Sequence, residues 1–170
     1  MRSQTDTTIC FRLVMATAFF VLASGTALAA PMRIEAVIIP KADSKLEFQD
    51  GSRRYLLAAH REGNAAGNGP LAGASVLEWG LHDVNPAAGA EANGYLIFTT
   101  ANGDKAYLKY RFRAVRVPGP DGKPRFLANG FWETAGGTGT LKDVQGGGTV
   151  RIDPKERRWI LEGDLVATQR

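Results

Sequence analysis

The segment Phe131–Val150, FWETAGGTGTLKDVQGGGTV, contains two glycine clusters that bracket a short apolar pair, Leu141 and Val144. A phosphate loop requires G-x-x-x-x-G-K-[ST], which this segment lacks. A dinucleotide-binding fingerprint requires a third glycine where Lys142 stands, and it opens a helix. The residues after the second cluster alternate instead, as in a strand. We therefore predict that these glycines serve the backbone, as corners and bulges between the strands of a closed sheet.

The clearest strand of the chain is Lys105–Val115, in which apolar and mostly basic residues alternate over the full length. The side chains predicted to share its buried face are Ala106, Leu108, Tyr110, Phe112 and Ala114. The β-prone run Gly94–Ala101 precedes it, and the turn dipeptide Asn102-Gly103 lies between the two. The sequence therefore predicts a hairpin over residues 94–115.

Other short strands are predicted along the rest of the chain. They cover residues 33–39, 46–48, 55–61, 74–83, 126–134, 149–152 and 159–166. Residues 62–73 and 85–93 are rich in glycine, asparagine and alanine, which predicts two loops. About eight or nine strands at short spacing, with glycine corners, predict an all-β fold, either a barrel or a sandwich. We favour the barrel, antiparallel and eight-stranded. A barrel leaves no free strand edges.

Residues 1–29 have the features of an export signal. The apolar run Leu13–Ala23 is too short to span a bilayer, and Ala27-Leu28-Ala29 fits the cleavage rule. We predict a signal helix over residues 1–29, one β-barrel domain over residues 30–170, and a periplasmic or secreted protein with no membrane span after cleavage. Cys10 is the only cysteine and precedes the apolar run, so the mature chain has no disulfide and no thiolate site.

Charge suggests a mildly basic protein. The whole chain has a formal net charge of +4, of which the predicted signal carries +1. A basic row lies on the outer face of the strand over 105–115 and just beyond it: Lys105, Lys109, Arg111, Arg113 and Arg116, interrupted by Tyr107. Such a row suits a single-stranded nucleic acid or an acidic polymer, or it is simply the solvated face of a barrel strand. Because an exported protein seldom meets nucleic acid, we expect no nucleic-acid partner.

Residues 74–83 also alternate, and their apolar positions predict a buried face. The residues on that face are Ser75, Leu77, Trp79 and Leu81. Glu78 and His82 fall on the opposite face, where one hypothesis has His60 approach from another strand as a third zinc ligand. The alternative is that all three are solvated polar positions. They are weak candidates, and we predict no metal and no other cofactor.

Beyond Leu71 the chain resembles the allene oxide cyclase barrel family and its dirigent-like relatives, small eight-stranded barrels of the wider calycin type. The resemblance rests on Gly94-Tyr95, Asn102-Gly103-Asp104, Gly130, the run Gly136-Gly137-Thr138-Gly139, and Val144-Gln145-Gly146 before Gly148-Thr149. It covers residues 71–165. It implies a barrel that encloses a hydrophobic substrate without metal or organic cofactor. The family's usual aromatic after the GTG is replaced by Leu141, and no catalytic cyclase residue matches a position here.

Hydrolytic chemistry finds little support in the sequence. No serine lies in a G-x-S-x-G elbow. Four acids are candidates for the paired carboxylates of glycoside chemistry, but their spacing does not favour a catalytic pair over turn and surface roles. These acids are Glu133, Asp143, Asp153 and Glu162. Catalytic residues are therefore left unassigned.

Six aromatic residues are candidates to line a ligand pocket: Trp79, Phe98, Tyr110, Phe112, Trp132 and Trp159. An eight-stranded barrel either fills its interior with such side chains or leaves room for one small ligand. The leading hypothesis is an exported barrel of unassigned activity that binds a small hydrophobic molecule. A cyclase, isomerase or dirigent-like enzyme that confines a hydrophobic intermediate is the first alternative. An envelope-associated structural protein is the second.

Overall fold

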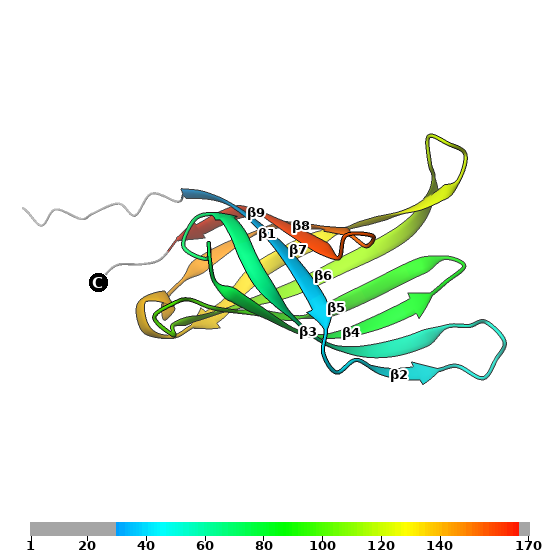
Figure 1. Ribbon diagram of the computed structural model, residues 1–170, viewed down its shortest axis with the longest axis horizontal. Helices are drawn as coiled ribbons and strands as arrows, with labels where there is room; N and C mark the ends of the chain where they lie inside the picture. Colours follow the sequence, from blue (N-terminus) through cyan, green and yellow to red (C-terminus); the bar gives the residue numbers. More distant parts are fainter. Residues whose placement is uncertain (1–29, 167–170) are drawn as a thin grey trace, which may run out of the picture.

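The protein is described from a computed structural model, in which residues 30–166 are placed; the predicted signal helix lies outside these residues. Nine strands and one short 3-10 segment make up this part of the chain (Figure 1). They are β1 (Ala30–Pro40), β2 (Ser44–Glu47), β3 (Tyr55–Asn68), β4 (Ser75–Asn85), β5 (Gly89–Thr99), β6 (Lys105–Pro118), β7 (Pro124–Gly137), η1 (Gly139–Leu141), β8 (Gln145–Asp153) and β9 (Arg158–Val166). Within residues 30–166 there is no helix with the length and apolarity needed to cross a membrane.

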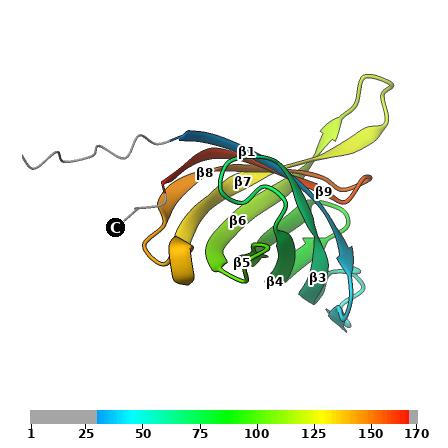
Figure 2. The same ribbon diagram turned by 60° about the vertical axis from the view of Figure 1, so that its left-hand side comes forward.

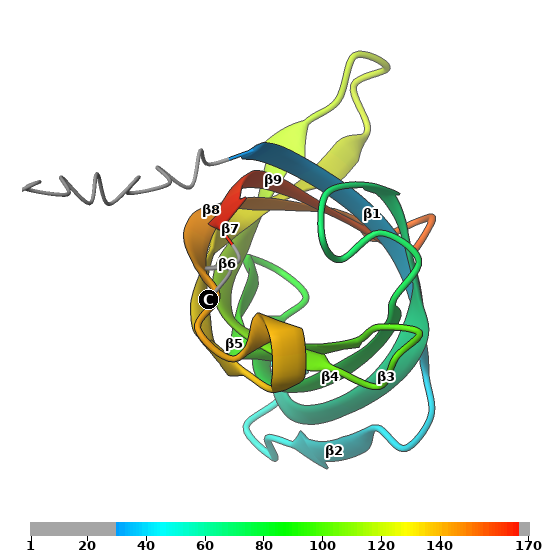
Figure 3. The same ribbon diagram turned by 90° about the vertical axis from the view of Figure 1, so that its left-hand side faces the viewer.

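The strands form one antiparallel sheet that closes on itself. The order is β1-β9-β8-β7-β6-β5-β4-β3, and β1 also pairs with the second half of β3, from Arg61 to Asn68. This pairing completes an eight-stranded barrel, as predicted, which is seen end-on in Figure 3. The extra strand β2 pairs with the first half of β3, beyond the point where β1 ends. Each strand pairs with the next strand in the chain, except that β1 does not pair with β2.

Alternation along β6 determines which side chains fill the barrel. Ala106, Leu108, Tyr110 and Phe112 are buried, whereas the basic residues between them lie outside, as the sequence predicts. The hairpin at Asn102-Gly103 is also confirmed, with Gly103 at a positive φ of 88°. Hairpin β6–β7 continues past the barrel wall and projects from it (Figure 2).

Both predicted loops are shorter than the sequence suggested. Strand β3 continues through most of residues 62–73 and ends at Asn68. A Cβ on Gly67 would lie 2.0 Å from the Arg33 carbonyl oxygen, so the glycine here permits close approach to β1 rather than a loop. Residues 85–93 are likewise mostly strand, because β5 already begins at Gly89. Glycine and alanine mark tight strand packing in both places.

The predicted faces of β4 are reversed. Val76, Glu78 and His82 point into the barrel and are buried, whereas Trp79 and Leu81 are 52% and 48% exposed on the outer surface. Register with β5 explains the reversal, because Glu78 is paired with buried Leu96 and His82 with buried Ala92. The pairing partners, and not the hydrophobicity of the strand, decide which face is inside.

One end of the barrel is plugged. The buried side chains of Leu71 and Ala74, from the β3–β4 connection, lie at this end with Leu141 and Val144, from the β7–β8 connection that contains η1. Figure 3 views the barrel from the end where η1 and the β3–β4 connection lie. The apolar pair between the two glycine clusters therefore closes the base of the barrel.

Candidate functional site

The opposite end of the barrel contains a cavity of about 550 Å³. Its wall is mainly apolar and includes Ile38, Val84, Phe112, Ile152 and Trp159. The charged residues among its lining positions are all arginines: Arg61, Arg116 and Arg157. A cavity of this volume is within the range of small-molecule sites.

The space comes from a row of small side chains around the wall. Ala90, Ala114 and Ala128 are register partners on β5, β6 and β7, and all three line the cavity. One layer deeper, the register partners on the same strands are Ala92, Phe112 and Gly130. Next come Gly94, Tyr110 and Trp132. Bulky rings therefore fill the barrel below, and the alanine row leaves its mouth open.

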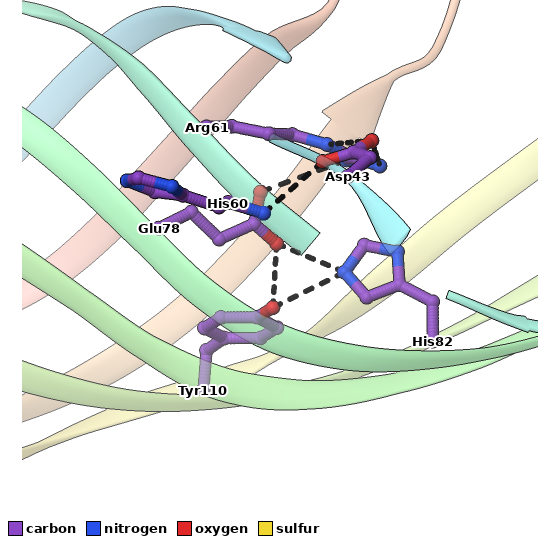
Figure 4. Close-up of polar contacts among 6 residues, drawn as sticks. All are labelled: Asp43, His60, Arg61, Glu78, His82 and Tyr110. Atoms are coloured by element: carbon purple, nitrogen blue, oxygen red, sulfur yellow. Dashed lines mark hydrogen bonds and ion pairs between the residues drawn. The ribbon is translucent and has the colours of Figure 1, made fainter. Parts of the chain in front are cut away.

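Three polar side chains meet at the floor of this cavity (Figure 4). The Tyr110 hydroxyl donates to Oε1 of Glu78 at 2.6 Å, and Nε2 of His82 lies 2.9 Å from the same oxygen. The distance from His82 Nε2 to the Tyr110 hydroxyl is 3.3 Å. Glu78 is fully buried, and His82 is 6% exposed and lines the cavity. We call Glu78, His82 and Tyr110 the floor cluster.

Arg61 compensates the charge of the floor cluster. Its Nη1 lies 3.6 Å from Oε2 of Glu78, an ion pair without a hydrogen bond, and its Nη2 lies 3.2 Å from Oδ2 of Asp43. Asp43 also accepts a hydrogen bond from the backbone N–H of His60. The connection between β1 and β2 thus also holds the guanidinium, while Oε2 of Glu78 keeps no hydrogen bond.

Glycines beside Tyr110 allow its ring to reach Glu78. The two residues lie on β6 and β4, with β5 between them. A Cβ on Gly80 would lie 2.1 Å from the Tyr110 oxygen, and Gly94 on β5 is the direct register partner of Tyr110. Any side chain at Gly80 would therefore occupy the position of the hydroxyl. The local sequence of β4 is matched to a ring that comes from another strand.

The chemistry of the floor cluster follows from its donors and acceptors. A carboxylate only accepts, so the hydrogen of a neutral His82 ring is assigned to Nε2, which leaves the lone pair of that tautomer on Nδ1. Figure 4 shows Nδ1 on the side of the ring directed away from Glu78 and Tyr110. Burial, followed by the adjacent charge of Glu78, raises the pKa of the Tyr110 hydroxyl well above its usual value. Tyr110 therefore stays protonated and donates to Glu78.

The predicted aromatic residues separate into three groups. Phe112 and Trp159 line the cavity, and their rings meet edge to face at 5.5 Å. Tyr110 packs against Trp159 at 4.9 Å from below, and Phe98 and Trp132 are buried in the core. Trp79 lies on the outer surface, so its prediction as a pocket residue is wrong. The cause is the reversed face of β4.

The three weak candidates for zinc ligands do not converge. Glu78 and His82 come together inside the barrel, but the His60 ring stacks on Trp79 outside it, with 4.3 Å between ring centroids. Over residues 30–166, no group of three histidine, cysteine or acidic side chains is arranged to hold a metal ion. The prediction that Glu78 and His82 share a face is confirmed, and the alternative that this face is solvated is wrong.

The acidic candidates from the sequence do not line the cavity. Glu133 and Glu162 are on the outer surface, where they pair with Lys109 and Arg33. Asp153 accepts backbone hydrogen bonds in the β8–β9 turn. The basic row of β6 is partly neutralised, since Arg113 also pairs with Glu91, and its last residue, Arg116, lines the cavity instead of the outer face.

Comparison with known proteins identified no relative. No protein-family model matches the chain, and neither the curated proteins nor the solved structures gave a match. The candidate site therefore depends on its own geometry. Sequence reasoning missed Arg61 and Asp43, which lie 18 residues apart and meet only because β2 folds back beside β3. The acid–histidine spacing in β4 was the one usable signal.

Proposed function

We propose that the protein binds a small hydrophobic molecule in the cavity at the open end of the barrel. The observation that carries this proposal is the asymmetry of the barrel: one end is plugged, and the other holds about 550 Å³ walled by apolar side chains and a row of alanines. Burial of an apolar ligand against Phe112, Trp159 and Ile152 would supply the affinity. The export signal predicted over residues 1–29 would place this binding in a periplasmic or extracellular setting.

Binding can be tested with N-phenyl-1-naphthylamine, a neutral dye that fluoresces in apolar surroundings. We expect the dye to bind residues 30–170 and to raise their melting temperature, because a ligand that binds only the folded state stabilises it. Ala114→Phe places a ring in the cavity and should abolish both signals. Ala66→Phe is the matched control, since Ala66 is exposed on the outside of β3. Equal dye binding by the two variants would overturn the proposal.

A second candidate function is catalysis on the bound molecule, of the isomerase, cyclase or dirigent-like kind. The floor cluster favours it, because a buried carboxylate and histidine destabilise a barrel interior unless they are paired, and such groups concentrate at active sites. The resemblance to allene oxide cyclase-like and dirigent-like barrels supports the same reaction class. It does not indicate which residues act.

A further inference from the structure

We infer that His82 Nδ1 is a proton acceptor for a carbon acid, and that the cavity therefore accepts an apolar ketone with an enolisable C–H. The inference rests on the proposed binding function and adds a reaction and its residues. It starts from the position of His82, which is the only member of the floor cluster among the residues that line the cavity. Nε2 is held by Glu78, so Nδ1 is the ring nitrogen left for a ligand.

The floor cluster has the arrangement that general-base catalysis requires. A base is most useful when a third group fixes its tautomer and stabilises the cation that forms. Glu78 does both, because its Oε1 lies 2.9 Å from Nε2 and its charge is buried beside the ring. Tyr110 donates to the same oxygen and holds the carboxylate in place. Glu78 and Tyr110 are positioning residues, and His82 is the catalytic residue.

The proposed step is a balanced proton transfer. The C–H bond beside the ketone carbonyl breaks, its proton moves to Nδ1, and its electron pair forms the carbon–carbon double bond of an enolate. The developing negative charge rests on the ketone oxygen, where the guanidinium of Arg61, which also lines the cavity, can stabilise it. The imidazolium then returns a proton to carbon, either at the same position or along a conjugated system. No electrons leave the pair of reactants, so no oxidant or reductant is needed.

The apolar wall adds to this chemistry. Excluding water strengthens the interaction between the enolate and Arg61 and prevents solvent from neutralising it. Phe112 is in edge-to-face contact with the His82 ring at 5.7 Å and limits its rotation. A ketone bound in the cavity against Phe112 and Trp159 would present its C–H to Nδ1. The structure thus combines an apolar cavity with one base, His82, whose orientation is fixed.

The test uses 2-tetralone, an apolar ketone with acidic C–H bonds, in deuterated buffer with residues 30–170. Mass spectrometry measures deuterium uptake, and displacement of the naphthylamine dye measures binding. We expect uptake to be faster with the wild-type protein than with His82→Gln by on the order of 10²-fold. His60→Gln is the matched control, because His60 is the other histidine and its ring lies outside the barrel. Its uptake should equal that of the wild type.

The outcomes separate the two proposals. Dye displacement by 2-tetralone with equal uptake in wild type and His82→Gln would overturn the base and leave the binding function standing. A dye that binds but is not displaced by 2-tetralone, together with no faster deuterium uptake in the wild type, would also overturn the role of His82 as the base. Absence of dye binding to the wild type would overturn the binding function and the inference with it.

Should His82→Gln not fold, nitrogen-15 spectra of the wild-type ring decide: hydrogen on Nε2 supports the inference, and hydrogen on Nδ1 with a bare Nε2 overturns it. In Glu78→Gln, a mixed tautomer is expected.

Discussion

The Tyr110 hydroxyl donates a 2.6 Å hydrogen bond to Oε1 of Glu78 across an intervening strand. Strand β5 separates the two residues, and Gly80 and Gly94 leave the space that the tyrosine ring crosses. This contact joins β4 to β6 inside the barrel and fixes the acid that orients His82. Removing Glu78, crowding the Tyr110 hydroxyl and titrating that hydroxyl should each change the stability of the protein measurably.

Removing the acid should destabilise the protein strongly. Glu78→Leu leaves Arg61 and His82 buried or half-buried without their carboxylate, and we expect a loss of about 3–5 kcal/mol in the free energy of unfolding. Urea unfolding measures it, with Glu133→Gln on the outer surface as control. Replacing the whole floor cluster, by Glu78→Leu, His82→Leu and Tyr110→Phe together, should recover most of the loss. If the triple variant were as unstable as Glu78→Leu, the polar contacts of the floor cluster would themselves be needed for stability, which contradicts this expectation.

Tyr110→Phe should change the alkaline stability of the protein. The raised pKa of Tyr110 means that the folded state keeps its proton after the unfolded tyrosine has lost its own, near pH 10. The unfolded state then binds fewer protons, so this contribution to stability is present below pH 10 and declines as the pH rises above it. Unfolding in urea at several alkaline pH values should show a shallower decline in Tyr110→Phe. Tyr95→Phe, at an exposed tyrosine, should keep the wild-type profile.

Gly80→Ala should crowd the floor cluster. The added Cβ would lie 2.1 Å from the Tyr110 oxygen, so either the ring or strand β4 must shift. We expect a loss of about 1–3 kcal/mol, as for overpacked cores, together with weaker dye binding. In the matched variant Gly147→Ala, the nearest atom to the new Cβ is 3.2 Å away, and the loss should be smaller. Equal losses in urea unfolding would contradict the proposed fit of Tyr110 over Gly80.

Acid should lower the stability of the folded protein through Asp104, which lies at the closed end of the barrel. Its carboxylate accepts hydrogen bonds from the backbone N–H and the hydroxyl of Thr140, at 2.9 and 2.6 Å, and these bonds lower the pKa of Asp104. A lowered pKa stabilises the folded state above the unfolded value, near pH 4, and this contribution is lost as the pH falls further. Asp104→Asn should therefore lower the melting temperature at pH 7 and have little effect at pH 2. A variant with the same deficit at both values would contradict this assignment.

The sequence by itself determined the fold class, because strict alternation in β6, turn dipeptides and glycines with a backbone role are local signals. It also placed Glu78 and His82 on one face, since residues four apart on a strand always share a side. It did not determine which side faces the interior. Apolar Trp79 and Leu81 outweighed Glu78 and His82 in any count of hydrophobicity, and only the register with β5 decided the matter.

The tertiary structure alone decided the site. Arg61 and Tyr110 reach Glu78 from separate strands, and Asp43 holds Arg61 from the β1–β2 connection; no spacing in the chain records that meeting. The open mouth likewise depends on alanines from β5, β6 and β7 that align only in the sheet. Local patterns specify strands because backbone geometry is local, whereas a cavity and its polar floor depend on which strands become neighbours when the sheet closes.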